Sequence, residues 1–189
     1  MEGKLFIFSA PSGSGKTTIV KNLLEKNLGL EFSISATSRA KRDNETDKKD
    51  YYFLTAEDFK EKIQGDDFVE WEEVYDNRFY GTLKTELERI WNQGKHVIFD
   101  VDVIGGINIK KKYQDRALSI FVMPPSVEEL ARRLNIRSSD SSEDIEVRLK
   151  KAKEELGYAE KFDLIIVNDE LEKAISESEK AIKEFINRS

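Results

Sequence analysis

Cysteine is absent from this chain of 189 residues, and histidine occurs once, as His96. The absence of cysteine excludes disulfide bonds and cysteine-ligated metal sites. A single histidine excludes a histidine-rich metal site and a conventional Ser-His-Asp triad, so we expect a structural role for His96. No apolar run approaches the roughly 18 residues that span a bilayer, and a membrane role therefore has no support.

Basic residues are outnumbered by acidic ones, with 31 Lys and Arg against 37 Asp and Glu. The formal net charge is −6, which argues against broad polyanion binding, although local arginine clusters can still bind phosphate on an acidic protein. We therefore expect no nucleic-acid partner, and no obligate protein partner is evident. The N-terminal segment lacks the basic start and the long apolar stretch of a signal peptide, so we expect a cytoplasmic protein.

The hydrophobic content of 39% can supply a sizeable core, and the length suits one domain with insertions. Short apolar runs rich in Ile, Val and Phe predict buried strands at residues 5–8, 97–99, 118–122 and 164–167. Helical periodicity predicts helices at residues 16–26, 83–93, 127–136, 143–157 and 171–186. This alternation predicts an α/β fold with a parallel sheet.

The alternation is interrupted between residues 32 and 82, where two shorter strands, residues 50–54 and 67–74, flank a helix that begins near Ala56. We interpret this segment as an inserted lobe. The serine-rich residues 137–144 are typical of a mobile connection.

Three helix boundaries have the expected residues. Thr55 with Asp58, and Ser126 with Glu129, have the spacing of capping boxes. Gly94 is suited to end a helix before the following strand.

Residues 9–18, SAPSGSGKTT, have the pattern of a phosphate-binding loop between a predicted strand and a predicted helix. In such a loop, backbone N–H groups point at phosphate oxygens near the positive end of the helix dipole. Lys16 can reach the β and γ phosphates, and the Thr17 hydroxyl can bind Mg²⁺. Ala10 replaces the first glycine of the pattern, but its methyl group is small, so we expect the loop to function. The predicted contacts are Ala10, Pro11, Ser12, Gly13, Ser14, Gly15, Lys16, Thr17 and Thr18.

Phosphate binding alone leaves a hydrolase, a switch protein and a kinase open, and a glycine-serine turn without a ligand is the structural alternative. A guanine-binding switch protein usually carries an Asn-Lys-x-Asp signature, which this chain lacks. A dinucleotide-binding loop would require a third glycine where Thr18 stands. The phosphate acceptor has to be sought elsewhere in the sequence.

Further motifs extend along nearly the whole chain: residues 32–54 (FSISATSRAKRDNETDKKDYYFL), 68–74 (FVEWEEV), 79–82 (FYGT), 99–106 (FDVDVIGG), 124–134 (PPSVEELARRL) and 166–169 (IVND). With these segments the chain resembles the guanylate kinase family, which transfers a phosphoryl group from ATP to GMP. The resemblance implies ATP and GMP as substrates, dGMP as a further acceptor and Mg²⁺ as cofactor. It also implies a P-loop nucleoside triphosphate hydrolase fold with a core at residues 1–32, 84–125 and 157–189, a GMP-binding lobe at 33–83 and a helical lid at 126–156.

The resemblance implies GMP contacts at Ser35, Arg39, Arg42, Tyr51, Glu70, Tyr80, Thr82 and Asp102. Arginine forks and phenol groups suit a monophosphate. The acceptor-only carboxylate of Glu70 suits the N1–H and N2–H₂ edge of guanine and not the corresponding edge of adenine. By resemblance, Ser35 and Thr82 donate to O6. Each residue taken alone is also compatible with a solvated arginine, a core aromatic or an exposed carboxylate.

Arg133 and Arg137 are four residues apart and so share one helix face, and Arg148 lies on the following predicted helix. The resemblance implies that these arginines belong to the lid and meet the ATP phosphates. The alternative for Arg133 is a surface pair with Glu129, and we expect Arg132 at the surface. The catalytic candidates, which would stabilise the transferring charge, are Lys16, Arg39, Arg137 and Arg148.

Asp100 follows an apolar run, where the carboxyl end of a strand opens toward an α/β active site. It is our candidate for the Mg²⁺ shell, through water and together with Thr17; an ordinary strand-end carboxylate is the alternative. Asn168 and Asp169, after the last predicted strand, resemble the adenine-side segment of the family and complete the expected ATP contacts.

Two other functions stay open. One is a guanylate-kinase-like module that binds proteins without catalysis, and the other is a P-loop kinase of another small phosphorylated acceptor. The segment before Tyr80 is one residue longer than the family pattern, and further departures are Lys41, Asn44, Lys48, Ile104 and Ser138.

Overall fold

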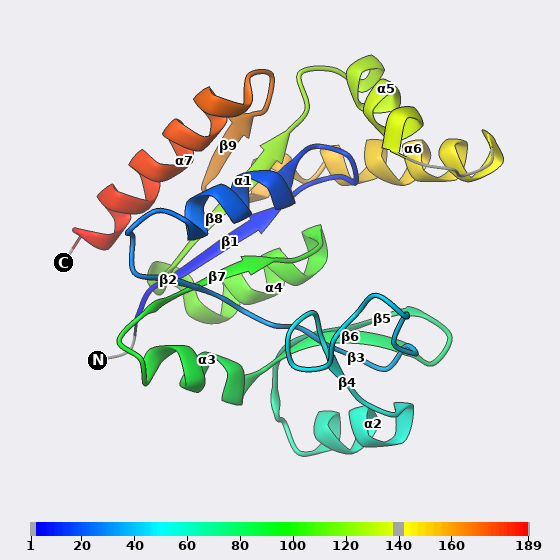
Figure 1. Ribbon diagram of the computed structural model, residues 1–189, viewed down its shortest axis with the longest axis vertical. Coiled ribbons are helices and arrows are strands. Elements are labelled where there is room, and N and C mark those ends of the chain that lie inside the picture. The colour runs from blue at the N-terminus through cyan, green and yellow to red at the C-terminus, as the bar shows by residue number, and fades with distance from the viewer. Residues whose placement is uncertain (1–2, 138–141, 189) are drawn as a thin grey trace. The chain divides into compact units, whose positions relative to one another are not determined.

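The computed structural model describes residues 3–137 and 142–188 (Figure 1). Its contacts divide the chain into two compact units, which we call the larger unit, Lys4–Leu30 with Ile98–Ser189, and the smaller unit, Met1–Gly3 with Glu31–Val97. One division falls between Gly3 and Lys4, and the other two fall inside strands, β2 (Leu30–Phe32) and β7 (His96–Asp100).

A five-stranded sheet with the strand order β2-β7-β1-β8-β9 forms the core of the fold. Strand β1 (Leu5–Ser9) pairs in parallel with β8 (Ala117–Met123), which pairs in parallel with β9 (Leu164–Val167). All five residues of β1 are buried, as expected for a strand with helices on both faces.

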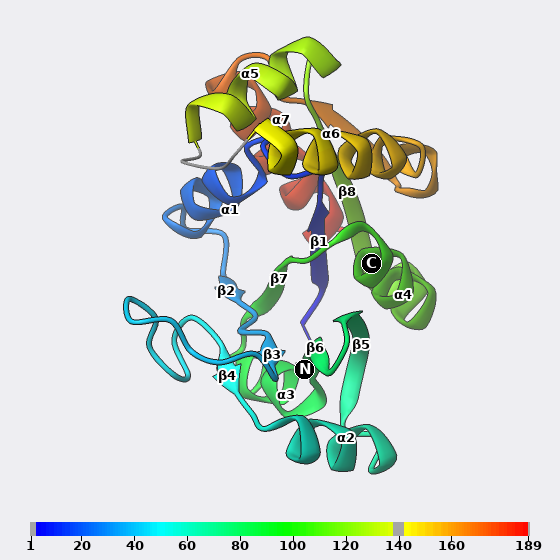
Figure 2. The same ribbon diagram turned by 90° about the vertical axis from the view of Figure 1, so that its right-hand side faces the viewer.

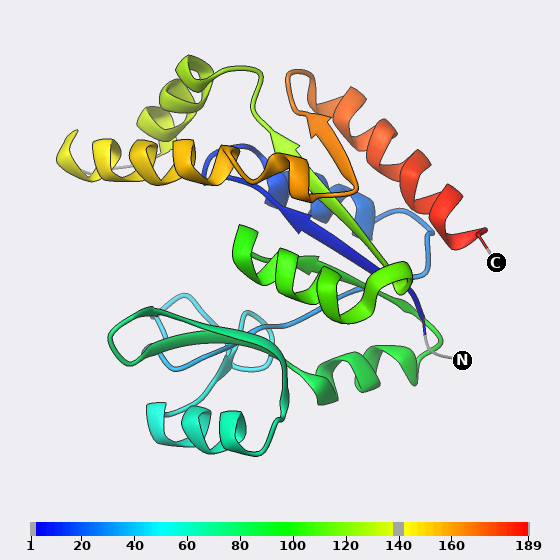
Figure 3. The same ribbon diagram turned by 180° about the vertical axis from the view of Figure 1, so that it is seen from behind.

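Helices lie on both faces of strands β1 and β8, whose side chains are almost all buried. On one face α1 (Lys16–Leu24) packs against α7 (Leu171–Ile186), and on the other α4 (Val103–Tyr113) contacts β1 and β8 (Figures 2 and 3). Because both faces are covered, the carboxyl ends of the strands are where side chains can meet a ligand. Short 3₁₀ helices, Gln114–Arg116 and Ala159–Lys161, complete the connections.

Helices α5 (Val127–Arg137) and α6 (Ser142–Leu156) pack on each other through a small core of Leu130, Leu134 and Ala152. Ser126 caps the start of α5, since its hydroxyl accepts a hydrogen bond from the Glu129 N–H at 3.1 Å, which is one of the two bonds of the predicted capping box. The serine-rich connection expected between the two helices includes residues 138–141, which lie outside the described residues.

The smaller unit holds a four-stranded sheet with the order β4-β3-β6-β5. Its strands are β3 (Ala36–Thr37), β4 (Tyr52–Phe53), β5 (Phe68–Tyr75) and β6 (Arg78–Leu83). Helices α2 (Ala56–Gln64) and α3 (Lys84–Trp91) contact β6. A cluster of Ala36, Phe59, Phe68 and Phe79 forms a separate hydrophobic core.

The four predicted core strands and five predicted helices are present, with ends shifted by no more than two residues, a shift common at element ends. The sequence interpretation missed α4 and the short strands β2, β3 and β6. Two glycines in the first turns of α4 hide its helical pattern, and Gly106 has a structural reason: a Cβ there would lie 2.4 Å from Ser9 Oγ. No helix in the described parts of the chain is both long and apolar enough to cross a membrane.

Candidate functional site

The phosphate-binding loop joins β1 to α1 in the larger unit. Gly13 and Gly15 have positive φ angles, 92° and 90°, which favour glycine. A Cβ at Gly15 would lie 2.2 Å from Asn168 Nδ2, and one at Gly13 would lie 3.0 Å from Leu134 Cδ2. Since no side chain caps the N-terminus of α1, its first amides are available to bind an anion. Ala10, 7% exposed, follows the last residue of β1.

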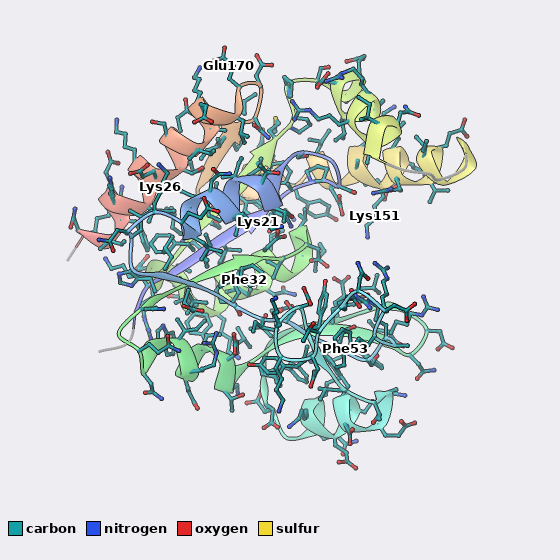
Figure 4. The ribbon with its side chains drawn as sticks, viewed as in Figure 1. Lys21, Lys26, Phe32, Phe53, Lys151 and Glu170 are labelled. Carbon is teal, nitrogen blue, oxygen red and sulfur yellow. The ribbon has the colours of Figure 1, made fainter. Side chains whose placement is uncertain are left out.

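A cavity of about 780 Å³ lies over the loop, within the usual range for small-molecule sites. The loop residues 10–18 line it together with Lys21, Asp100, Val101, Asp102, Arg148, Lys151 and Glu155. Four lysines and arginines, on α1 and α6, line this cavity; Figure 4 labels two of them, Lys21 and Lys151. This clustering of positive charge suits a polyphosphate on a protein that is acidic as a whole.

Lys16, Thr17 and Asp100 form one connected group at the loop. The Lys16 Nζ atom lies 2.7 Å from Asp100 Oδ1 and donates to the Val101 carbonyl at 2.6 Å. The Thr17 hydroxyl donates to Asp100 Oδ2 at 2.7 Å. A hydroxyl oxygen and a carboxylate therefore lie side by side next to the phosphate cradle.

The arginines of α5 and α6 have different surroundings. The Arg148 guanidinium donates to Ser12 Oγ at 2.9 Å, so it lies directly at the loop. Arg133 pairs with Glu129 at 2.8 Å and also donates to the Asn168 carbonyl at 3.1 Å, so the predicted surface pair and a link to the Asn168 segment exist together.

Two other arginines of α5 complete this group. Arg132 pairs with Glu129 and has a side chain that is 62% exposed, as expected. Arg137 is the last residue of α5, and its side chain lies outside the described part of the structure.

Asn168 and Asp102 support the site through local contacts. Asn168, 5% exposed, donates from Nδ2 to the Ser14 carbonyl at 2.8 Å and so braces the loop. Asp102 lines the cavity and caps α4 by accepting from the Gly105 N–H at 2.7 Å. Asp169 is exposed.

The smaller unit contains a second group, centred on Arg39. The Arg39 guanidinium donates to both oxygens of Glu45, at 2.7 and 2.5 Å, and lies 5.0 Å from the centroid of the Tyr51 ring. The rings of Tyr51 and Tyr80 meet edge to face with centroids 6.1 Å apart. The hydrogen bonds that Arg39 donates to Glu45 raise the pKa of Arg39 above its usual value. The guanidinium lies beside the aromatic rings of Tyr51 and Phe53.

Glu45 was missed by the sequence interpretation because a carboxylate among lysines and aspartates looks like an ordinary surface residue. It accepts from the Arg39 side chain and from the Arg42 N–H at 2.9 Å, and these bonds lower its pKa to about 2. The Arg42 side chain is exposed. The spacing of Arg39, Arg42 and Glu45 at every third residue was the available signal.

Glu70 and Thr82 lie opposite each other on β5 and β6. Thr82 is 0% exposed, and its hydroxyl donates to Glu70 Oε1 at 2.9 Å. Ser35 lies before β3, and its carbonyl accepts from the Tyr52 N–H at 2.9 Å. The smaller unit thus contains the Arg39–Glu45 pair and a carboxylate, Glu70, that is bonded to the opposite strand.

The chain matches the family model described as guanylate kinase over residues 2–185. It is 55% identical to the guanylate kinase of Bacteroides thetaiotaomicron over 188 residues, which cover 100% of this chain and 92% of that relative. It is 54% identical to the guanylate kinase of Porphyromonas gingivalis over 184 residues, 97% of this chain and 98% of the relative. A crystal structure of guanylate kinase from Anaplasma phagocytophilum superposes with a TM-score of 0.79 at 29% identity, covering 99% of this chain and 88% of that one.

Proposed function

The chain belongs to the guanylate kinase family, and we propose that it transfers the γ-phosphoryl group of ATP to GMP, giving ADP and GDP, with dGMP as a further acceptor. The observation that carries the proposal is that one chain contains two groups with complementary chemistry. The larger unit has a phosphate-binding loop with Lys16, and the smaller unit has Arg39 against the ring of Tyr51 and, on β5, the Glu70 carboxylate as a candidate acceptor for guanine.

The cradle supports ATP binding in the larger unit. Backbone amides at the start of α1 would bind the β and γ phosphates, and Lys16 would balance the charge that develops on transfer. Arg148, which already contacts the loop through Ser12, would supply a second positive charge from the proposed lid, residues 126–156. Arg133 and Arg137 are further lid candidates, and Asn168 would act by holding the loop.

Mg²⁺ is the cofactor that the family implies, and the donors present fit it. The hydroxyl of Thr17 and the carboxylate of Asp100 are hard oxygen donors that already lie within 2.7 Å of each other. Among the described residues no group of three or more His, Cys, Asp or Glu could hold a metal by itself. Mg²⁺ does not need such a group, because it keeps several waters and takes substrate phosphate oxygens as ligands. When bound, it would neutralise charge on the transferring phosphoryl group.

The smaller unit supports GMP as the acceptor. Arg39, with Arg42, Tyr51 and Tyr80, would bind the monophosphate, and Glu70 would accept from N1–H and N2–H₂ of guanine. Adenine lacks this pair of donors, so it would form fewer hydrogen bonds with Glu70, and a site built for these bonds typically rejects such an analogue by about 10⁴-fold or more.

The transfer itself needs little covalent work from the protein. A GMP phosphate oxygen would attack the γ-phosphorus in line, forming a new P–O bond as the bond to the β-γ bridging oxygen breaks and ADP leaves. Because the attacking oxygen is already ionised near neutral pH, no side chain is required as a general base. Alignment of the two reacting atoms at about 3 to 3.5 Å, together with nearby positive charge, supplies the rate enhancement.

A coupled assay of ADP production tests the proposal. With Mg²⁺ and ATP, GMP should drive ADP formation far above the rates with AMP or without acceptor. Equal background rates in all three would favour a binding module without catalysis. Turnover of another phosphorylated acceptor without guanine selectivity would favour a P-loop kinase of another small acceptor. The cytoplasmic location and the absence of obligate partners stay predictions.

A further inference from the structure

Glu86, in the first turn of α3, has a buried carboxylate that none of the steps above uses. Its side chain is 0% exposed. Oε1 accepts from the Ile34 N–H at 2.9 Å and from Arg89 Nη2 at 2.8 Å, and Oε2 accepts from the Tyr52 hydroxyl at 2.7 Å and from Arg89 Nε at 2.9 Å. One carboxylate thus receives four hydrogen bonds, all from the smaller unit.

These hydrogen bonds connect three segments of the smaller unit. Ile34 lies in the link between β2 and β3, Tyr52 begins β4, and Arg89 lies one turn further along α3. Arg89 Nη2 also donates to the Phe32 carbonyl at 3.4 Å, which ties the same link a second time. The carboxylate of Glu86 therefore fixes the link and β4 against the helix.

In two of these segments, the residue that bonds to Glu86 is adjacent in the sequence to a proposed GMP contact. Ser35 follows Ile34, and Tyr51 precedes Tyr52. The Tyr52 N–H donates to the Ser35 carbonyl at 2.9 Å, so the two neighbours are also joined directly. A shift of the Ile34 backbone would move Ser35 away from its place.

Stability alone does not account for a group of this kind. Replacing a buried ion pair by apolar side chains of similar volume is often neutral or stabilising, because desolvation offsets the attraction. The hydrogen bonds instead fix the orientation of the groups around Glu86, since each donor must point at one carboxylate oxygen. Burial, together with the bond to Glu86, raises the pKa of Tyr52 to about 12.

We propose that Glu86 is a positioning residue for the acceptor nucleotide: its carboxylate holds Ser35 and Tyr51 in the arrangement that binds GMP, without contacting the substrate. The inference rests on the proposed function, because it matters for activity only if the smaller unit binds GMP.

The test compares Glu86→Gln with Glu88→Gln, a matched change at an exposed position of the same helix. Glutamine has nearly the volume of glutamate, but its amide NH₂ group is itself a donor and faces at least one of the four donors around this position. At least one of the four hydrogen bonds is therefore lost in Glu86→Gln. We expect the KM for GMP to rise about tenfold. The KM for ATP and the kcat at saturating GMP should stay within about twofold of the wild type, and Glu88→Gln should change none of the three.

Amide hydrogen exchange gives a readout that is independent of turnover. In Glu86→Gln the Ile34 amide should exchange faster than in Glu88→Gln, because its acceptor is weakened. An unchanged KM for GMP in a folded Glu86→Gln protein overturns the inference, and so does a joint rise of the KM values for both substrates. A wild-type protein that does not phosphorylate GMP overturns the proposed function instead, and the exchange of Ile34 then still reports whether Glu86 holds the link.

If Glu86→Gln does not fold, Tyr52→Phe removes only one of the four bonds and keeps the ring. Its KM for GMP should rise about threefold, with the KM for ATP unchanged. A KM for GMP equal to that of the wild type in this variant overturns the inference.

Discussion

The Arg39 guanidinium and the Glu45 carboxylate form a two-pronged ion pair, with both arginine nitrogens bonded to separate carboxylate oxygens. The side chains are each only 13% exposed, so the pair is shielded from solvent more than an ordinary surface pair. Since Glu45 also accepts from the Arg42 N–H, the turn that carries both arginines is held in place before any anion arrives.

This pair predicts a specific dependence of stability on pH. The pKa of Glu45 in the folded chain, about 2, lies below its ordinary value of 4.5. Its contribution to stability is therefore complete above pH of about 5 and is lost as the pH falls from about 4.5 toward 2. Urea unfolding of the wild type and of Glu45→Gln should differ by a constant amount from pH 8 to 5, and the difference should shrink below that range. A difference that shrinks between pH 8 and 6 contradicts the assignment; Glu61→Gln, an exposed position on α2, is the control.

The turn before Tyr51 predicts a stabilising substitution. Lys48 has a φ of 61°, which costs a residue with a Cβ about 1 kcal/mol or more, and its N–H donates to the Tyr51 carbonyl at 2.8 Å. Lys48→Gly removes the strain but increases the freedom of the unfolded chain, so we expect a net gain of about 0.5 kcal/mol in the free energy of unfolding. Lys49→Gly, at a position without positive φ, should be destabilising. If urea denaturation gives changes of the same sign in the free energy of unfolding for both variants, the result is inconsistent with this account.

Lys16 is predicted to act on the rate and not on the fold. Lys16→Met should lower kcat by about 10²- to 10³-fold, because it removes the positive charge that would stabilise the transferring phosphoryl group. Asp100 keeps its bond from Thr17, so we expect the melting temperature to change little. The control is Lys26→Met, which removes a lysine of the same unit that pairs with Glu179 at 2.7 Å. A kcat for Lys16→Met within tenfold of the control speaks against a catalytic role.

Glu70 is predicted to decide which purine is accepted. Glu70→Ala should lower kcat/KM for GMP by at least about 10²-fold and leave the weak rate with AMP nearly unchanged, so that the selectivity collapses. Thr82 loses its hydrogen-bond acceptor in this variant, so circular dichroism should confirm that the fold is intact. Equal losses with GMP and AMP would assign Glu70 to the fold alone.

Much of the larger unit was predictable because its signals are contiguous in the sequence. The loop from Ala10 to Thr18 is one uninterrupted motif, and the strands around it are runs of apolar residues with buried side chains. Helix α4 was not predictable in this way, because it packs against the sheet with glycines. It therefore lacks the amphipathic pattern of a half-exposed helix.

The supporting contacts of the site were harder to foresee, because they join residues that are far apart in the chain. Glu86 and Arg89 are spaced like a surface pair on one helix turn, yet the carboxylate is buried by Ile34 and Tyr52, more than thirty residues away. Asn168 reaches the Ser14 carbonyl across 154 positions. Individual site residues follow from their chemistry, whereas the partners that hold them depend on tertiary packing.

The central claim is that one chain binds two nucleotides and that a carboxylate selects guanine in the acceptor. The most direct measurement is the initial rate of ADP formation with MgATP and equal concentrations of GMP, AMP or no acceptor. The account predicts rapid turnover with GMP and, with AMP, a rate lower by about 10⁴-fold or more. Equal rates with GMP and AMP, or no ADP formation that depends on GMP, would contradict it.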